Sequence, residues 1–157
     1  MHPLLITLVL TSFSRTQLTW SDFKAPVPET ELNVAARTRT ALEYTSTDSN
    51  GVFTCHVEAV FLSDESWVRI KTDANLSHET THWQICQLKA ALCNKALAQY
   101  QNKKHVSEPA VMKICTHYQL EIDDLNKQFD YETQHGNNPI TEVAYERHIL
   151  NDLNKLH

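Results

Sequence analysis

The sequence predicts an α+β domain, in which an N-terminal antiparallel β-region packs on a long antiparallel helix pair followed by a C-terminal helix. Two observations lead to this fold class. The first half of the chain contains two stretches with strand-like alternation, separated by an Asn50-Gly51 turn. The second half contains three stretches with helical periodicity, at about residues 75–103, 107–134 and 141–156.

A chain of 157 residues is expected to form one domain, and we place it at residues 15–157. Residues 1–14 contain a short apolar run at positions 4–10, followed by a Ser-Phe-Ser sequence that resembles a signal-peptide cleavage site. No Lys or Arg precedes the run, so we expect either a signal peptide or a first β-strand. No apolar run is long enough to predict a transmembrane segment.

The composition excludes several classes of partner and reaction. A net charge of −5 predicts no basic surface for nucleic acid. The chain has only two glycines, Gly51 and Gly136, and therefore lacks the glycine-rich phosphate loops of P-loop and dinucleotide-binding domains. The oligomeric state is not predicted by any feature of the sequence.

The predicted β-region is a hairpin. Residues 38–47 partly alternate, and residues 48–51 have the composition of a tight turn. The return strand at residues 52–62 places five apolar side chains on one face: Phe53, Cys55, Val57, Ala59 and Phe61. We expect Trp20 and Phe23 to anchor the preceding segment, and Trp67 to begin a short apolar stretch that leads into the first helix.

Capping and breaking signals predict where the later helices begin and end. Ser107 is the expected N-cap of the second helix, with Pro109 in its first turn. This helix should end near Gln134, because residues 136–139 read Gly-Asn-Asn-Pro, and Thr141 is the expected cap of the third helix. The second helix has a packing seam with spacings of three and four: Val111, Cys115, Tyr118, Ile122, Leu125 and Phe129.

Residues 78–82 read His-Glu-Thr-Thr-His and lie within the first predicted helix. Positions i and i+4 share one helix face, so His78 and His82 are expected to bind a single metal ion. Glu79 lies about 100° around the helix from His78, where a carboxylate is beside the metal and can accept a proton from a water. This His-Glu-x-x-His pattern is typical of zincin-like metallohydrolases.

The third metal ligand is expected at the end of the second helix. A short connector at residues 104–107 predicts two antiparallel neighbouring helices, which places His82 level with position 129 and His78 level with position 133. Three side chains with ligand atoms return to this level: Asp130, Glu132 and His135. We expect His135 to bind the ion, with Glu132 as either the alternative third ligand or the group that orients His135.

The four cysteines are Cys55, Cys86, Cys93 and Cys115. An even number suits an exported protein with one or two disulfides, and three pairings are possible. The alternative is that all four are buried free thiols. None has the Cys-x-x-Cys spacing of a cysteine zinc site.

Over residues 16–153 the chain resembles the bacterial domain of unknown function 922 family, described as predicted secreted zinc-dependent proteases. The resemblance rests on four segments: Leu18-Thr19-Trp20-Ser21-Asp22-Phe23, Ser66-Trp67-Val68, Leu76-Ser77-His78-Glu79-Thr80-Thr81-His82-Trp83, and Asp130-Tyr131-Glu132-Thr133-Gln134-His135-Gly136. It implies a zinc ion, a secreted or periplasmic protein, and a peptide or protein substrate. The chain departs from the family pattern at Thr80, Trp83 and Gln87, where the family usually has Gln, Phe and an acidic residue.

The predicted function is a zinc-dependent hydrolase, most simply a metallopeptidase. A bound zinc lowers the pKa of a water to about 7, and Glu79 is the expected general base that takes its proton. The expected donors to the oxyanion are Tyr131, Tyr145 and His148. Two alternatives are a non-catalytic zinc-binding module, with the ion enclosed by four protein ligands, and a metal-free helical interaction protein.

Overall fold

The computed structural model describes residues 15–49, 52–101 and 107–156. Its helices are α1 (Asp73–Gln101), α2 (Glu108–Thr133) and α3 (Pro139–Asn154), and its strands are β1 (Ala36–Arg37), β2 (Thr40–Ser49), β3 (Val52–Phe61) and β4 (Trp67–Val68). The predicted α+β class is therefore confirmed. The predicted signal peptide or first strand at 1–14, the Asn50-Gly51 pair and most of the connector between the long helices lie outside the described residues.

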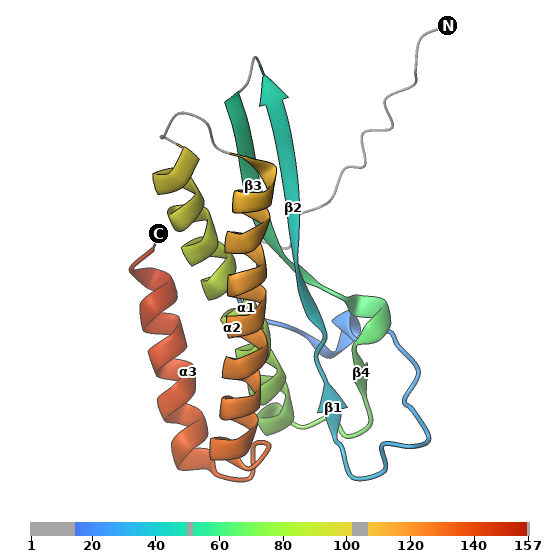
Figure 1. The fold of residues 1–157 in the computed structure, drawn as a ribbon. Helices are drawn as coiled ribbons and strands as arrows, with labels where there is room; N and C mark the ends of the chain where they lie inside the picture. Colours follow the sequence, from blue (N-terminus) through green and yellow to red (C-terminus); the bar gives the residue numbers. More distant parts are fainter. Residues whose placement is uncertain (1–14, 50–51, 102–106, 157) are drawn as a thin grey trace, which may run out of the picture.

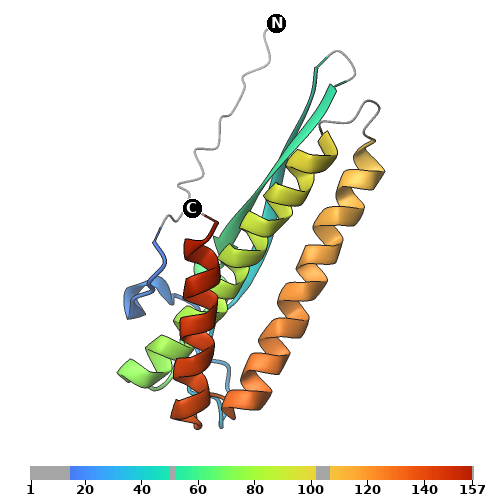
Figure 2. The same ribbon diagram turned by 90° about the vertical axis from the view of Figure 1, so that its left-hand side faces the viewer.

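Helix α1 is the central element of the fold. The β2–β3 hairpin lies along one side of it, and both α2 and α3 pack against it (Figures 1 and 2). Because α1 is covered from several directions, even polar side chains in its first half are buried, including His78, Glu79 and Thr81. The His-Glu-x-x-His motif therefore lies largely inside the molecule, where His78 contacts Asp130 near the end of α2 and Glu142 near the start of α3.

The predicted hairpin is confirmed, with Thr40 opposite Phe61 at one end and Ser49 opposite Val52 at the other. A side-chain amide ties it to α1, because Asn94 Oδ1 accepts the Val57 N–H at 2.8 Å and Asn94 Nδ2 donates to the Val57 carbonyl at 2.7 Å. This pair of bonds satisfies both backbone groups of a buried residue and holds the strand in register with the helix.

Strands β1 and β4 form a second antiparallel pair that the sequence did not predict. Each strand has two residues, which is too short for an alternating pattern to be recognised. The pair leads into Thr38, whose hydroxyl donates to the Glu79 carbonyl at 3.3 Å. The small sheet therefore connects the N-terminal half of the chain to α1 beside the motif.

Three apolar clusters form the core. The first joins the N-terminal segment and β3 to α1 and α2, and includes Phe23 and Trp83. The ring centroids of Phe23 and Trp20 lie 5.3 Å apart, so the predicted anchors of this segment do pack together, although only Phe23 is buried. The second cluster lies between β3, α1 and α2. The third joins all three helices through Ile85, Phe129 and Ile149.

All four cysteines are buried free thiols, so the structure agrees with the alternative of free thiols and not with that of disulfides. Cys55, Cys93 and Cys115 share the second cluster, where the Cys115 side chain bonds with both of the others. Burial raises the pKa of Cys55 to about 11 and that of Cys93 to about 12, and the neighbouring thiols make smaller contributions in the same direction to both. Burial also raises the pKa of Cys86 to about 12.

These thiols are expected to react slowly with alkylating reagents in the folded protein. A rise in pKa from 9.0 to about 12 lowers the thiolate fraction at pH 8 about a thousandfold, and the thiolate is the nucleophile. Mass spectrometry after iodoacetamide treatment should find Cys86 and Cys93 unmodified in the native protein and all four cysteines modified in urea. Rapid native alkylation, or fewer than four reactive thiols in urea, would contradict this picture.

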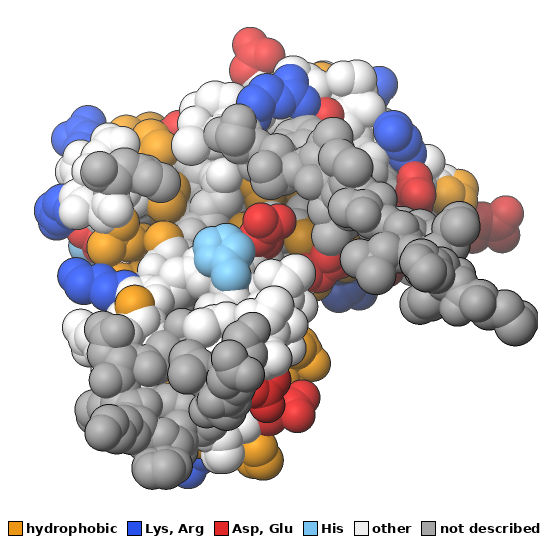
Figure 3. Space-filling view, turned by 90° about the horizontal axis from the view of Figure 1, so that it is seen from above, with side chains coloured by type: hydrophobic (Ala, Val, Ile, Leu, Met, Phe, Trp, Pro, Cys, Tyr) orange, Lys and Arg blue, Asp and Glu red, His pale blue; other side chains and the backbone are white. Residues whose placement is uncertain are grey.

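None of the helices in the described parts of the chain is long and apolar enough to cross a membrane. Figure 3 looks onto the end of the molecule that carries the hairpin tip. On the described part of that face, acidic, basic and hydrophobic side chains are interspersed, with no large area of one sign (Figure 3).

Candidate metal centre

The two histidines of the motif meet at their Nε2 atoms. His78 and His82 lie one turn apart on α1, their rings are perpendicular, and their Nε2 atoms are 3.3 Å apart. Phe129 of α2 stacks on the His78 ring at 4.7 Å and meets the edge of the His82 ring at 5.0 Å. This fully buried phenyl ring limits the movement of both imidazoles and keeps their Nε2 atoms together.

Asp130 supplies a third ligand atom at the same point. Its Oδ1 lies 3.1 Å from His78 Nε2 and 3.0 Å from His82 Nε2. Two ligand atoms bound to one tetrahedral zinc at about 2.0–2.1 Å lie roughly 3.3 Å apart, close to the spacing observed here. Within the described part of the chain, these three residues form the group that is positioned to hold a metal ion.

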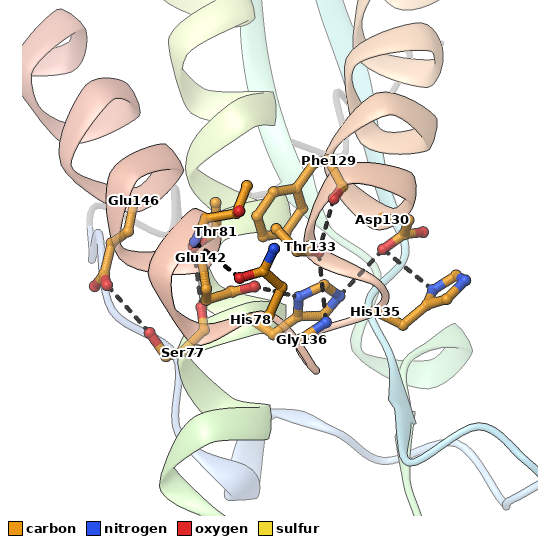
Figure 4. Close-up of polar contacts among 12 residues, drawn as sticks. Ser77, His78, Thr81, Phe129, Asp130, Thr133, His135, Gly136, Glu142 and Glu146 are labelled. Atoms are coloured by element: carbon orange, nitrogen blue, oxygen red, sulfur yellow. Dashed lines mark hydrogen bonds and ion pairs between the residues drawn. The ribbon is translucent and has the colours of Figure 1, made fainter.

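The far side of each imidazole faces an oxygen atom. Glu142 Oε2 of α3 lies 3.1 Å from His78 Nδ1 (Figure 4). Asn126 Oδ1 of α2 lies 2.9 Å from His82 Nδ1. An oxygen that accepts at Nδ1 selects the tautomer with its proton on Nδ1 and its lone pair on Nε2. Metal-binding histidines in proteins usually have such an outer partner.

The charges around His78 favour a cation at this point. Burial by itself lowers the pKa of this imidazole, but hydrogen bonds to Asp130 and Glu142, with the negative charges of Glu142 and Glu79, outweigh burial and raise the pKa to about 9. Burial also disfavours the charged form of Asp130 and so raises its pKa. Its hydrogen bonds to both histidines outweigh this effect and hold the pKa of Asp130 well below its usual range. In the absence of a metal, a proton therefore supplies the positive charge.

The donor set fits a zinc ion. When each ring carries its proton on Nδ1, two nitrogen lone pairs and one carboxylate oxygen converge with no proton between them, an arrangement that a cation stabilises. The His78 and His82 side chains are 8% and 11% exposed, whereas that of Asp130 is 32% exposed. The group is therefore enclosed by the protein except on the Asp130 side, which is open to solvent.

Glu79 lies next to this group and is buried, with 5% of its surface exposed. Its Oε2 atom has no hydrogen-bond partner among the described residues, and its charge contributes to the raised pKa of His78. Burying a carboxylate oxygen without a hydrogen-bond partner costs free energy of folding. Its position beside a metal-binding group therefore makes Glu79 a candidate functional residue.

The structure does not bring His135, the expected third ligand, into the group with His78 and His82, and the reason is the end of α2. The helix ends at Thr133, and the next three residues have left-handed backbone, with φ of 53° at Gln134, 52° at His135 and 81° at Gly136. Because the last turn does not continue, the His135 side chain is 76% exposed and lies beside Asp130, with Nδ1 3.6 Å from Asp130 Oδ1.

The other predicted site residues also have different partners. Glu132 accepts a hydrogen bond from Gln128 at 2.7 Å on the exposed face of α2 and also bonds with Tyr145, so the structure does not bring it to the metal-binding group. Tyr131 is 84% exposed. His148 pairs with Asp152 at 3.5 Å. Among the three predicted oxyanion donors, His148 lies outside the metal-binding group of the described residues, whereas the Tyr145 ring packs against Phe129 with ring centroids 5.2 Å apart.

Two outer partners were not predicted from the sequence. Asn126 lies one helical turn before Asp130, so the i, i+4 spacing that identified the two histidines also relates these two residues on α2. That signal was available in the sequence once Asp130 was taken as a ligand. Glu142 has no such signal, because it reaches His78 only through the packing of α3.

No protein-family model matches the chain, and neither a curated protein nor a solved structure is similar enough to match it. The resemblance to the domain of unknown function 922 family therefore stays a prediction from the sequence.

Proposed function

We propose that the protein is a zinc-dependent hydrolase that cleaves peptide bonds. The observation that carries this proposal is the convergence of His78 Nε2, His82 Nε2 and Asp130 Oδ1 within 3.0–3.3 Å, beside the buried and unpartnered Oε2 of Glu79. Nitrogen and oxygen ligands in this number, with a neighbouring glutamate, are typical of catalytic zinc sites.

Under this proposal the protein residues divide into ligands and outer partners. His78, His82 and Asp130 hold the ion, while Glu142 and Asn126 keep both Nε2 lone pairs directed at it. When bound, zinc acidifies a water and polarises a substrate carbonyl. Three protein ligands leave a fourth position for that chemistry, which favours a catalytic site over the alternative of a closed structural site.

Glu79 moves the proton. Its Oε2 has no hydrogen bond to another described residue, so this oxygen is available to accept the proton of a water that attacks the substrate. The same carboxyl group then gives the proton to the amine that leaves. Its buried surroundings strengthen the electrostatic interactions involved, because little water competes for them.

Removal of the metal tests this proposal directly. We expect the zinc-loaded full chain to cleave an unstructured protein such as casein, to lose this activity when 1,10-phenanthroline and dialysis remove the ion, and to regain it when one equivalent of zinc is added. Cleavage would be measured by mass spectrometry of the products. Activity that survives removal of the metal, or a zinc-loaded chain that cleaves no member of a diverse peptide library, would refute the proposal.

A further inference from the structure

Helix α3 brings one carboxylate into the interior against the metal-binding group. Glu142 lies in the first turn of α3, 64 positions from His78 in the chain, and is 7% exposed. Its Oε2 lies 3.1 Å from His78 Nδ1, and its Oε1 is buried with no hydrogen-bond partner in the described residues. A buried carboxylate with a single partner is stable only if that partner interacts with it strongly.

We propose that Glu142 is a positioning residue for metal binding: its Oε2 accepts the Nδ1–H of His78, which directs the Nε2 lone pair at the ion and couples the docking of α3 to metal binding. This inference rests on the metal site of the proposed function and does not depend on peptide hydrolysis. It assigns a role to the third helix that no motif in the sequence predicts.

Hydrogen bonds at the start of α3 hold the first turn of the helix, and with it Glu142, in place. Asn138 caps the helix by accepting the Thr141 N–H at 3.4 Å, and its own N–H donates to the Thr133 carbonyl at 2.8 Å, which ties α3 to the end of α2. The positive end of the α3 dipole favours an ionised side chain in the first turn.

Gly136, in the turn between α2 and α3, also lies near the Nδ1 edge of His78. Gly136 has a φ of 81°, and a Cβ atom added there would lie 3.5 Å from His78 Nδ1. The turn between α2 and α3 therefore lies close to the imidazole, which is surrounded by this turn, Glu142 and Asp130 (Figure 4). Any displacement of α3 would move both the turn and the carboxylate that contact the ring.

The same helix offers a matched control. Glu146 lies one turn after Glu142, and its Oε2 accepts a hydrogen bond from the Ser77 hydroxyl at 3.3 Å. Figure 4 shows the two glutamates on the side of α3 that faces the start of α1. Glu146 bonds to the residue next to His78 in the chain, so it shares the helix docking with Glu142 but not the contact with the imidazole.

The experiment measures zinc affinity by competition with a chromophoric chelator for the full chain and its variants. We expect Glu142→Ala to weaken binding about 10–100-fold, the range typical of outer partners of metal ligands. Glu142→Gln should weaken binding less, because the amide oxygen still accepts the Nδ1–H. Glu146→Ala should stay within about twofold of wild type, since it leaves the His78 ring and its partners in place.

A second readout separates positioning from general stability. In the zinc-bound wild type, ¹⁵N NMR should find the His78 proton on Nδ1, and the Glu142→Ala variant should show a mixture of tautomers. Hydrogen exchange should also show that zinc protects the first turns of α3 in the wild type. This last measurement needs no variant to fold.

Three results would overturn the inference. They are unchanged zinc affinity in Glu142→Ala, an equal loss in Glu146→Ala, or no zinc-dependent protection of α3 in the wild type. A wild type that binds zinc but cleaves no peptide would refute the proposed function and leave this inference intact. A wild type that does not bind zinc would refute both.

Discussion

Asp130→Ala is expected to abolish zinc binding at micromolar zinc, whereas His135→Ala is expected to retain it. The first change removes one of three ligand atoms and the negative charge between the two imidazoles. The loss should therefore exceed the 10–100-fold effect typical of outer partners. The second change removes an exposed side chain that lies outside the ligand group.

Metal content of the purified variants, measured by inductively coupled plasma mass spectrometry, decides between the two residues. Asp124→Ala is the matched control, because Asp124 is an 82% exposed carboxylate on the same helix, near Lys127. His78→Ala should lose the metal as Asp130→Ala does. Stoichiometric zinc in Asp130→Ala together with its loss in His135→Ala would restore the ligand set predicted from the sequence.

Glu79→Gln is expected to lower peptide hydrolysis about 10²–10⁴-fold, the usual contribution of a general acid–base group. Glutamine has nearly the same shape as glutamate but cannot accept the proton. The ligand atoms of His78, His82 and Asp130 are untouched, so zinc should still bind, weakened only by the loss of the Glu79 charge that favours a cation at this point.

The comparison requires both zinc affinity and steady-state hydrolysis on the same preparations. Glu58→Gln is a suitable control, because Glu58 is a carboxylate on β3 that pairs with His56, away from the metal-binding group. Hydrolysis in Glu79→Gln that matches the wild type would show that another group transfers the proton. A simultaneous loss of zinc and activity would instead indicate a structural role for Glu79.

Patterns among neighbouring residues were sufficient to predict the hairpin, the three helices and the two histidines of the site. Alternation around residues 48–51 predicted the β2–β3 hairpin, and capping signals predicted the limits of α2 and α3 to within a few residues. The i, i+4 spacing predicted that His78 and His82 meet, and the antiparallel geometry predicted the level on α2 from which the third side chain of the group comes. These features depend on helix and strand periods, which are properties of neighbouring residues.

The remaining features depend on where a helix ends and how helices dock. His135 was expected on the helical face, but three consecutive residues with left-handed backbone turn it outward, and Asp130 is the α2 side chain that joins the two histidines. The pairing of Glu142 with His78 joins residues 64 positions apart, and no periodicity relates them. The β1–β4 pair is likewise too short to produce a pattern.

The sequence by itself determined that two imidazoles and a glutamate share one turn of a central helix, because the geometry of a helix places those residues without help from the rest of the chain. Only the tertiary structure decided which carboxylate completes the group and which ones hold the rings in place. Those choices depend on the backbone angles of three residues after α2 and on the docking of α3, and both are results of packing across the whole molecule.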